Sequence, residues 1–190
     1  LNVYVKRDDM SGMEWSGNKI RKLEFSIQEA LDRGADTLIT CGGIQSNHCR
    51  ATAAAAARLG LRSCLLLRTD DPDPLLDGNY FIDKVLGADI RFISAEDYRS
   101  RRGEVMEELA GEFERQGHKA YIIPEGASNG IGTFGYLSCM QEILQQEKEM
   151  GVQFDTIVDA VGSGGTLAGL VLANRLYGLN KRIVGINVCD

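Results

Sequence analysis

The chain has 190 residues, of which 44% are hydrophobic and 25% charged, a balance typical of a globular protein and not of a disordered one. Its 21 lysines and arginines against 27 aspartates and glutamates give a formal net charge of −6, which argues against nucleic acid as a partner. No apolar run approaches the roughly 20 residues that a membrane helix needs. The opening residues show no signal-peptide pattern, so we expect a cytoplasmic protein, and their strand-like sequence suggests that the chain begins inside a fold.

Apolar runs and glycine breaks predict strands and helices that alternate along the chain. The expected strands cover residues 1–5, 37–41, 63–67, 89–93, 119–123, 154–161 and 182–188. The expected helices open after Gly17 and cover 47–59, 75–86, 102–116, 131–150 and 166–177. The runs at 64–67 and 156–158 are continuous and not alternating, which is typical of strands buried on both faces. We therefore expect an α/β fold with parallel sheets covered by helices.

The cysteines indicate neither a disulfide framework nor a metal site. They are five in number, widely spread and without a C-x-x-C pair. Cys41 and Cys64 lie in apolar runs, and we interpret them as buried, unreactive thiols of a protein from a reducing compartment.

A glycine-rich segment lies between a predicted strand and a predicted helix. Residues 162–169 read Gly-Ser-Gly-Gly-Thr-Leu-Ala-Gly. Glycines let successive N–H groups face one point, the helix start adds a positive dipole, and Ser163 and Thr166 add hydroxyl donors. The segment lacks the Gly-Lys-Ser/Thr of a P-loop and the third glycine of a dinucleotide fingerprint. It predicts a phosphate site, with a simple tight turn as the alternative.

A second strand-to-helix junction reads Gly-Gly-Ile-Gln-Ser-Asn-His at residues 42–48. Ser46 or Asn47 is a natural N-cap. Capping alone and a carboxylate site at the helix start, with Ser46 as a hydroxyl for proton transfer, fit this spacing equally well. His48 by itself indicates no function, because an isolated histidine is more often structural.

Two lysines, Lys19 and Lys22, follow Gly17 on one face of a predicted helix. The helix dipole disfavours Lys19 as a cation, so Lys19 could act as an amine nucleophile, although the spacing also fits two solvated surface lysines. A phosphate site, a carboxylate-binding helix start and an amine nucleophile are together the parts that pyridoxal phosphate chemistry requires.

Five segments, in order along the chain, resemble the D-cysteine desulfhydrase/1-aminocyclopropane-1-carboxylate deaminase family of fold-type II pyridoxal phosphate enzymes. They are residues 5–9, 16–25, 42–50, 123–129 and 162–166. The family is similar to the tryptophan synthase β subunit. The resemblance implies two open parallel-sheet α/β domains with helices on both faces. It places residues 1–33 and 131–190 in a larger cofactor domain and 34–130 in a smaller one. It also implies a homodimer and a longer chain whose C-terminal part is absent here.

Carried over by position, the resemblance implies a role for each site residue. Lys19 matches the lysine that forms the Schiff base with pyridoxal phosphate, and Lys22 matches a lysine that contacts the cofactor phosphate. The phosphate loop is matched by Gly162, Ser163, Gly164, Gly165 and Thr166. Ser46, Asn47 and His48 fall on the stretch that binds the substrate carboxylate. Ser46 would assist proton transfer, and Asn47 would also approach the ring hydroxyl.

The implied activity is that of a carbon–sulfur lyase, which converts D-cysteine to pyruvate, ammonia and hydrogen sulfide. Opening of the cyclopropane ring of 1-aminocyclopropane-1-carboxylate, to 2-oxobutyrate and ammonia, is the alternative within the family. An alternative from another class is a non-catalytic protein that binds a phosphorylated metabolite at residues 162–166.

Overall fold

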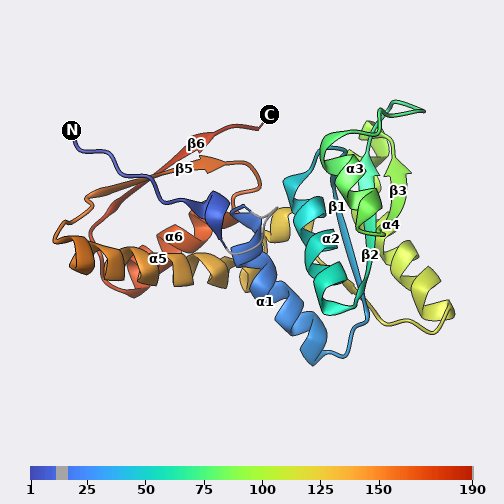
Figure 1. The fold of residues 1–190 in the computed structure, drawn as a ribbon, viewed down its shortest axis with the longest axis horizontal. Coiled ribbons are helices and arrows are strands. Elements are labelled where there is room, and N and C mark those ends of the chain that lie inside the picture. Colours follow the sequence, from blue (N-terminus) through green and yellow to red (C-terminus); the bar gives the residue numbers. More distant parts are fainter. Residues whose placement is uncertain (12–16, 190) are drawn as a thin grey trace. The chain divides into compact units, whose positions relative to one another are not determined.

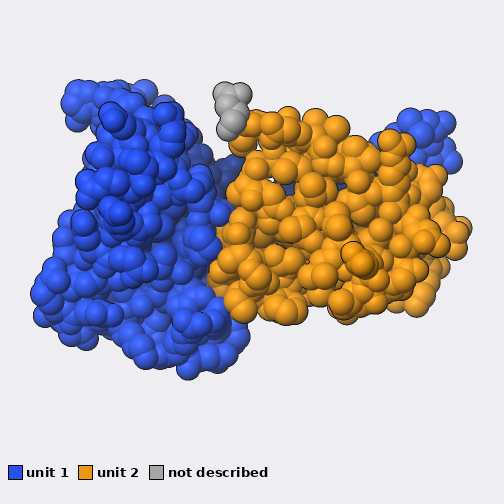
Figure 2. All heavy atoms as spheres, turned by 180° about the vertical axis from the view of Figure 1, so that it is seen from behind, with its two compact units in different colours: residues 1–20, 27–126 blue, residues 21–26, 127–190 orange. Residues whose placement is uncertain are grey.

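The computed structural model describes residues 1–11 and 17–189, and Figure 1 traces their path. The chain forms two compact units, which Figure 2 colours separately. Unit 1 contains residues 1–20 and 27–126, and unit 2 contains residues 21–26 and 127–190. Helix α1 (Lys19–Asp32) contributes residues to both units. The domain division in the sequence prediction, by contrast, groups all of 1–33 with 131–190 and stays a prediction.

Unit 1 is built on a four-stranded parallel sheet in the order β3-β2-β1-β4. The strands are β1 (Thr37–Gly43), β2 (Arg62–Arg68), β3 (Asp89–Ile93) and β4 (Ala120–Ile122). Three helices accompany them: α2 (Asn47–Leu59), α3 (Gly78–Val85) and α4 (Ala95–Arg115) (Figure 1). Each parallel crossover in this unit that joins neighbouring strands passes through a helix, as parallel pairing requires.

The central strands of this sheet are buried on both faces. Cys64 and Leu66 belong to a core cluster that includes Tyr98, Met106, Leu109, Ala110 and Phe113 of α4. Leu65 and Leu67 belong to a second cluster with Cys49 and Ala53 of α2 and Tyr80 of α3. Because successive side chains of a strand point to opposite faces, two cores form on one strand. The prediction of two-faced burial at residues 64–67 is confirmed.

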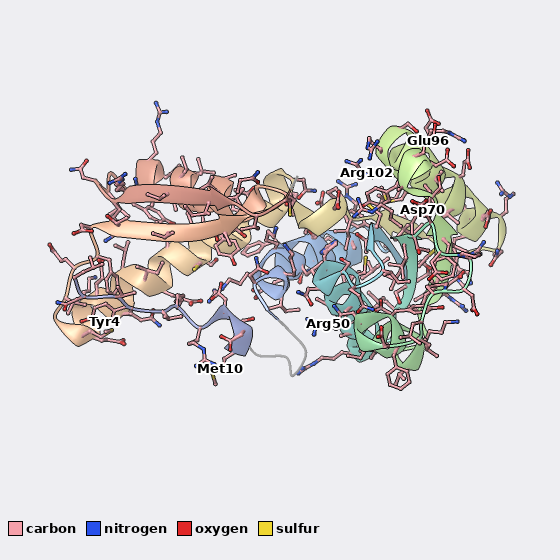
Figure 3. All side chains as sticks on the ribbon, turned by 90° about the horizontal axis from the view of Figure 1, so that it is seen from above. Tyr4, Met10, Arg50, Asp70, Glu96 and Arg102 are labelled. Carbon is pink, nitrogen blue, oxygen red and sulfur yellow. The ribbon has the colours of Figure 1, made fainter. Side chains whose placement is uncertain are left out.

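Helix α4 begins seven residues earlier than predicted, at Ala95 instead of residue 102. Ser94 is its N-cap, and the Ser94 hydroxyl accepts a hydrogen bond from the Asp97 N–H at 3.0 Å. Asp70 supports the same end, because its Oδ1 accepts from the Ala95 N–H at 2.8 Å (Figure 3). Glu96 and Asp97 also favour this end of the dipole. The sequence carries these N-terminal signals, and the prediction did not use them.

Unit 2 pairs two parallel strands with two helices. They are β5 (Thr156–Val161), β6 (Arg182–Asn187), α5 (Gly130–Met150) and α6 (Gly165–Leu176). Ile157 and Ile183 pack against the core of Tyr136, Met140, Leu170 and Ala173. Val158 and Ile186 are 65% and 53% exposed. The prediction of burial on both faces at residues 156–158 is therefore wrong in this structure, because α5 and α6 pack against the face that carries Ile157.

The opening residues also differ from the prediction. Residues 1–5 form no strand, and the first regular element is the short 3-10 helix η1 (Asp8–Met10). A strand needs a hydrogen-bonded neighbour, and no described strand pairs with residues 1–5. Elsewhere the α/β fold with parallel sheets is confirmed. Among the described helices, none is both long enough and apolar enough to cross a bilayer.

Candidate active site

Lys22 is a lysine buried inside unit 2. Only 1% of it is exposed, and its Nζ donates a hydrogen bond to Ser128 Oγ at 3.2 Å. Ser128 Oγ is in turn 2.7 Å from Ser163 Oγ. Removing an ammonium group from water is unfavourable, and an anionic partner offsets that loss. The ammonium and the two hydroxyls therefore form a donor set suited to an anion.

The glycine turn between β5 and α6 approaches this donor set closely. A Cβ atom at Gly165 would lie 2.6 Å from Ser128 Oγ, which is closer than real Cβ contacts allow. Gly164, the N-cap of α6, has a φ of +84°, in the left-handed region that favours glycine. The start of α6 adds N–H groups and the positive end of the helix dipole. Thr166, in the first turn, is buried.

These residues fit a phosphate group. Phosphate offers several acceptor oxygens and negative charge, which match an ammonium, hydroxyls and a helix N-terminus. The structure thus brings together Lys22, Ser163 and the glycine turn, which the sequence placed far apart. The sequence analysis assigns no role to Ser128, although this residue lies in the family-like segment 123–129. The neighbouring Asn129 caps α5, since its Oδ1 accepts from the Gly132 N–H at 2.9 Å.

Lys19 is the first residue of α1 and precedes Lys22 by one helical turn. Residues three apart on a helix share a face, so the two amines project from the same side of α1. The N-cap Asn18 makes no side-chain cap bond. Ser16, which belongs to the same motif, lies outside the described residues.

Ser46 caps α2 in unit 1. Its Oγ accepts a hydrogen bond from the Cys49 N–H at 3.2 Å, which leaves its own hydroxyl proton to donate elsewhere. A Cβ at Gly42 would lie 2.5 Å from this Oγ, so the turn requires glycine there. The capping role is thus confirmed, and the proton-transfer role stays a prediction. Asn47, the next residue, accepts at its Oδ1 from Asn79 Nδ2 at 2.9 Å.

The His48 ring is a structural part of the junction between β1 and α2. It is 3% exposed, and its Nε2 lies 2.8 Å from Thr40 Oγ1. Thr40 Oγ1 donates its single proton to Ile123 O at 2.8 Å, so the histidine Nε2 must carry a proton and donate. The Nε2 proton of His48 is therefore used inside the fold. The predicted carboxylate contact of His48 stays a prediction.

The buried thiols of unit 1 are not suited to act as nucleophiles. All five cysteines are free, and Cys41, Cys49 and Cys64 are buried. Burial raises the pKa of Cys64 to about 12 and also raises the pKa of the other two, which keeps these thiols protonated. No group of three or more His, Cys, Asp or Glu within the described ranges is arranged to hold a metal ion.

Comparisons with known proteins identify a matching family and several similar proteins. The family described as "Pyridoxal-phosphate dependent enzyme" matches residues 1–190. A mitochondrial bifunctional D-cysteine desulfhydrase/1-aminocyclopropane-1-carboxylate deaminase of Arabidopsis thaliana is 48% identical over 99% of this chain and 49% of its own length. A D-cysteine desulfhydrase of Serratia proteamaculans is 40% identical over 98% of this chain and 57% of its own.

A solved structure of a homologue of 1-aminocyclopropane-1-carboxylate (ACC) deaminase is also similar. It has a TM-score of 0.89 and 45% identity, and the match covers 97% of this chain and 55% of that one. The chain therefore spans about half the length of the curated relatives that it matches.

Proposed function

Because this chain belongs to the family of pyridoxal-phosphate dependent enzymes, we propose that its protein catalyses the α,β-elimination of D-cysteine to pyruvate, ammonia and hydrogen sulfide. When bound, pyridoxal phosphate supplies an electron sink for the carbon that carries the substrate amine. The observation that supports the proposal most directly is the buried Lys22 amine beside the Ser128 and Ser163 hydroxyls.

In this proposal unit 2 binds the cofactor phosphate. The Lys22 ammonium supplies charge, the Ser163 and Thr166 hydroxyls donate, and the glycines of the 162–165 turn leave room for close approach. The start of α6 adds its dipole. Lys19, one turn before Lys22, supplies the amine that attaches covalently to the cofactor aldehyde.

The start of α2 binds the substrate in this proposal. The first N–H groups of a helix have no intrahelical acceptor, so they suit the substrate carboxylate. Asn47 donates to the same carboxylate and also approaches the ring hydroxyl of the cofactor. Ser46 keeps its hydroxyl proton for donation, since it accepts from the Cys49 N–H, and it therefore suits proton transfer near the substrate.

Borohydride trapping tests the covalent step. We expect that reduction in the presence of pyridoxal phosphate labels one peptide, that peptide mass analysis places the label on Lys19, and that Lys19→Ala abolishes the label. Sulfide and pyruvate release from D-cysteine should be lost in the same variant. A label on another lysine, or unchanged labelling of Lys19→Ala, would contradict the assignment.

The second candidate is 1-aminocyclopropane-1-carboxylate deamination. The relative from Arabidopsis thaliana carries both activities in its name, and the solved structure is titled as an ACC deaminase homologue. Parallel assays separate the two substrates, because D-cysteine yields pyruvate and the cyclopropane substrate yields 2-oxobutyrate. A homodimer and a cytoplasmic location are part of the same proposal, and light scattering on the purified protein tests the dimer.

A further inference from the structure

Asn79, in the first turn of α3, is hydrogen-bonded to the segment that opens α2. Its Nδ2 donates to Gln45 O at 2.8 Å and to Asn47 Oδ1 at 2.9 Å. Its backbone N–H donates to Gln45 Oε1 at 2.8 Å. All of these residues belong to unit 1, in which α3 packs beside α2 (Figure 1). A helix that carries no predicted site residue thus holds the residue predicted to bind substrate.

Gln45 completes these contacts from the other side. Its Nε2 donates to Asp77 Oδ1 at 2.9 Å and to Asp77 O at 3.3 Å. Asp77 is the N-cap of α3 but makes no side-chain cap bond, so Gln45 Oε1 acts as the acceptor for this helix start. A Cβ at Gly78 would lie 2.4 Å from Gln45 Oε1, and the φ of Gly78 is +51°. We call Gln45, Asp77, Gly78 and Asn79 the 45–79 clasp.

The clasp fixes which end of the Asn47 amide faces Asn79. Gln45 O is a carbonyl oxygen that only accepts, so the Asn79 atom facing it must be the NH₂ group. The second proton of that NH₂ group points to Asn47, so the Asn47 atom there must be the acceptor Oδ1. Asn47 therefore has its Nδ2, which only donates, to offer to a ligand.

We propose that Asn79 is a positioning residue that holds Asn47 as a hydrogen-bond donor to the carboxylate of an amino-acid substrate and to the ring oxygen of the cofactor. This inference rests on the proposed function, in which Asn47 contacts that carboxylate. A donor stabilises an anion, whereas the carbonyl end of the same amide repels it. The two ends have nearly the same shape, so the hydrogen bond from Asn79 selects the orientation.

Two substitutions separate this role from packing. Asn79→Ala removes the donor, whereas Asn79→Asp keeps the shape but offers only acceptors when ionised. The aspartate would attract Asn47 Nδ2 and turn Oδ1 toward the substrate. The ligand is D-alanine, an amino acid with no β leaving group, and the change in cofactor absorbance on the loaded protein reports its binding. We expect Kd to rise about 10-fold for Asn79→Ala and about 100-fold for Asn79→Asp.

A double-mutant cycle shows whether Asn79 acts through Asn47. In the Asn47→Ala background, both Asn79 substitutions should change the Kd for D-alanine by less than about 2-fold. Asn174→Ala is the matched control, because Asn174 also bridges a loop, with its Nδ2 on Lys181 O at 2.9 Å. It should leave that Kd unchanged. Asn79 effects that persist in full without Asn47 would overturn the proposal.

Side-chain amide NMR of the cofactor-free protein gives a readout that needs no cofactor. The Asn47 NH₂ signals, assigned by their loss in Asn47→Ala, should shift in Asn79→Asp and not in Asn174→Ala. If Lys19 is not labelled in the wild type, the proposed function is wrong. The NMR comparison would still show whether Asn79 sets the orientation of the Asn47 amide. If Lys19 is labelled in the Asn79 variants and these variants bind D-alanine with the wild-type Kd, this inference is wrong while the proposed function still holds.

Discussion

Lys22 is the residue whose burial most clearly calls for a functional explanation. Its amine lies in the interior of unit 2 against Ser128. An apolar side chain of similar size at this position would often give equal or greater stability than a buried ammonium group. Stability alone therefore does not explain the lysine, and we infer a functional reason for it. The proposed reason is the cofactor phosphate, and the charge can be removed without removing the side-chain stem.

Lys22→Met should therefore separate binding from stability. We expect the Kd for pyridoxal phosphate to rise about 10- to 100-fold, since a charge-assisted hydrogen bond is lost. The free energy of unfolding of the cofactor-free protein should fall by no more than about 1 kcal/mol. Fluorescence titration and urea unfolding measure the two quantities. Lys148→Met, on the exposed side of α5, is the control. An unchanged cofactor Kd for Lys22→Met would remove Lys22 from the site.

A substitution at Gly165 tests whether the glycine turn must lie close to Ser128. In Gly165→Ala the new Cβ would lie 2.6 Å from Ser128 Oγ and 3.0 Å from Ser128 Cα, so the turn must move. We expect a loss of about 1–3 kcal/mol in unfolding free energy together with weaker cofactor binding. Gly103→Ala, in the middle of α4 with open space around it, should instead stabilise by about 0.5–1 kcal/mol. Thermal unfolding of the two variants should move in opposite directions.

At the scale of elements, the sequence predicts what depends on local pattern. Strand β3 has the predicted bounds, because the short segment Asp-Ile-Arg-Phe-Ile, with apolar residues at alternate positions, lies between Gly87 and Ser94. Helix α2 also has the predicted bounds, because Ser46 caps it and Gly60 ends it in the left-handed conformation. Residues 1–5 failed as a strand because a strand depends on a partner that local sequence does not reveal.

In the candidate site, too, local motifs are predictable from the sequence and contacts between distant residues are not. The glycine turn and the capped start of α2 are visible as motifs, since backbone geometry demands glycine and a capping hydroxyl there. The contact between Lys22 and Ser128 joins positions far apart in the chain, so spacing cannot reveal it. The bond from Asn79 to Asn47 is hidden for the same reason.

A buried ion pair in unit 2 joins Glu147, in the last turn of α5, to Lys181, the residue before β6. Glu147 Oε1 accepts from Lys181 Nζ and from the Phe154 N–H, each at 2.5 Å. Lys181 Nζ also donates to Phe154 O at 2.8 Å. Burial alone would raise the pKa of Glu147, but these hydrogen bonds and the lysine charge outweigh burial and lower it. The carboxylate therefore stays charged and holds the loop after α5.

Lys181→Met should destabilise unit 2 by about 3–5 kcal/mol, because it leaves the Glu147 carboxylate buried without its counter-charge. Glu147→Leu combined with Lys181→Met should recover most of that loss. In the wild type the Glu147 contribution is present above its unfolded pKa, near 4.3, and disappears as pH falls through its lowered folded pKa. Urea unfolding of the three proteins at neutral pH measures the effect. A double variant as unstable as Lys181→Met alone would refute the pairing.

At the scale of the whole molecule, one buried carboxyl group should make unfolding depend strongly on pH between its unfolded and folded pKa. Asp83 on α3 is fully buried, and neither of its oxygens has a hydrogen-bond partner among the described residues. Burial raises its pKa to about 7, although the charge of Arg50, on α2 (Figure 3), acts in the opposite direction. Its contribution to stability is greatest below its unfolded pKa near 3.9 and is lost as pH rises to about 7.

Asp83→Asn should remove this pH dependence, because an amide does not titrate. The stability of the variant relative to the wild type should increase by about 2–4 kcal/mol between pH 4 and pH 8, whatever the amide costs at a single pH. Urea unfolding at several pH values within that range gives the difference. Asp73→Asn, in an exposed loop, should run parallel to the wild type. A parallel curve for Asp83→Asn as well would show that the buried group stays ionised.

Cofactor binding should also stabilise the molecule as a whole, since a ligand held only by the folded chain shifts the unfolding equilibrium. At a free concentration of 100 times Kd, pyridoxal phosphate should add about 2.7 kcal/mol to the unfolding free energy. Lys22→Met should need a proportionally higher concentration for the same increment. Pyridoxal phosphate that merely modified surface lysines would react with folded and unfolded chains alike and add no such increment. Thermal unfolding across a concentration series therefore distinguishes a built site from incidental labelling, independently of any turnover.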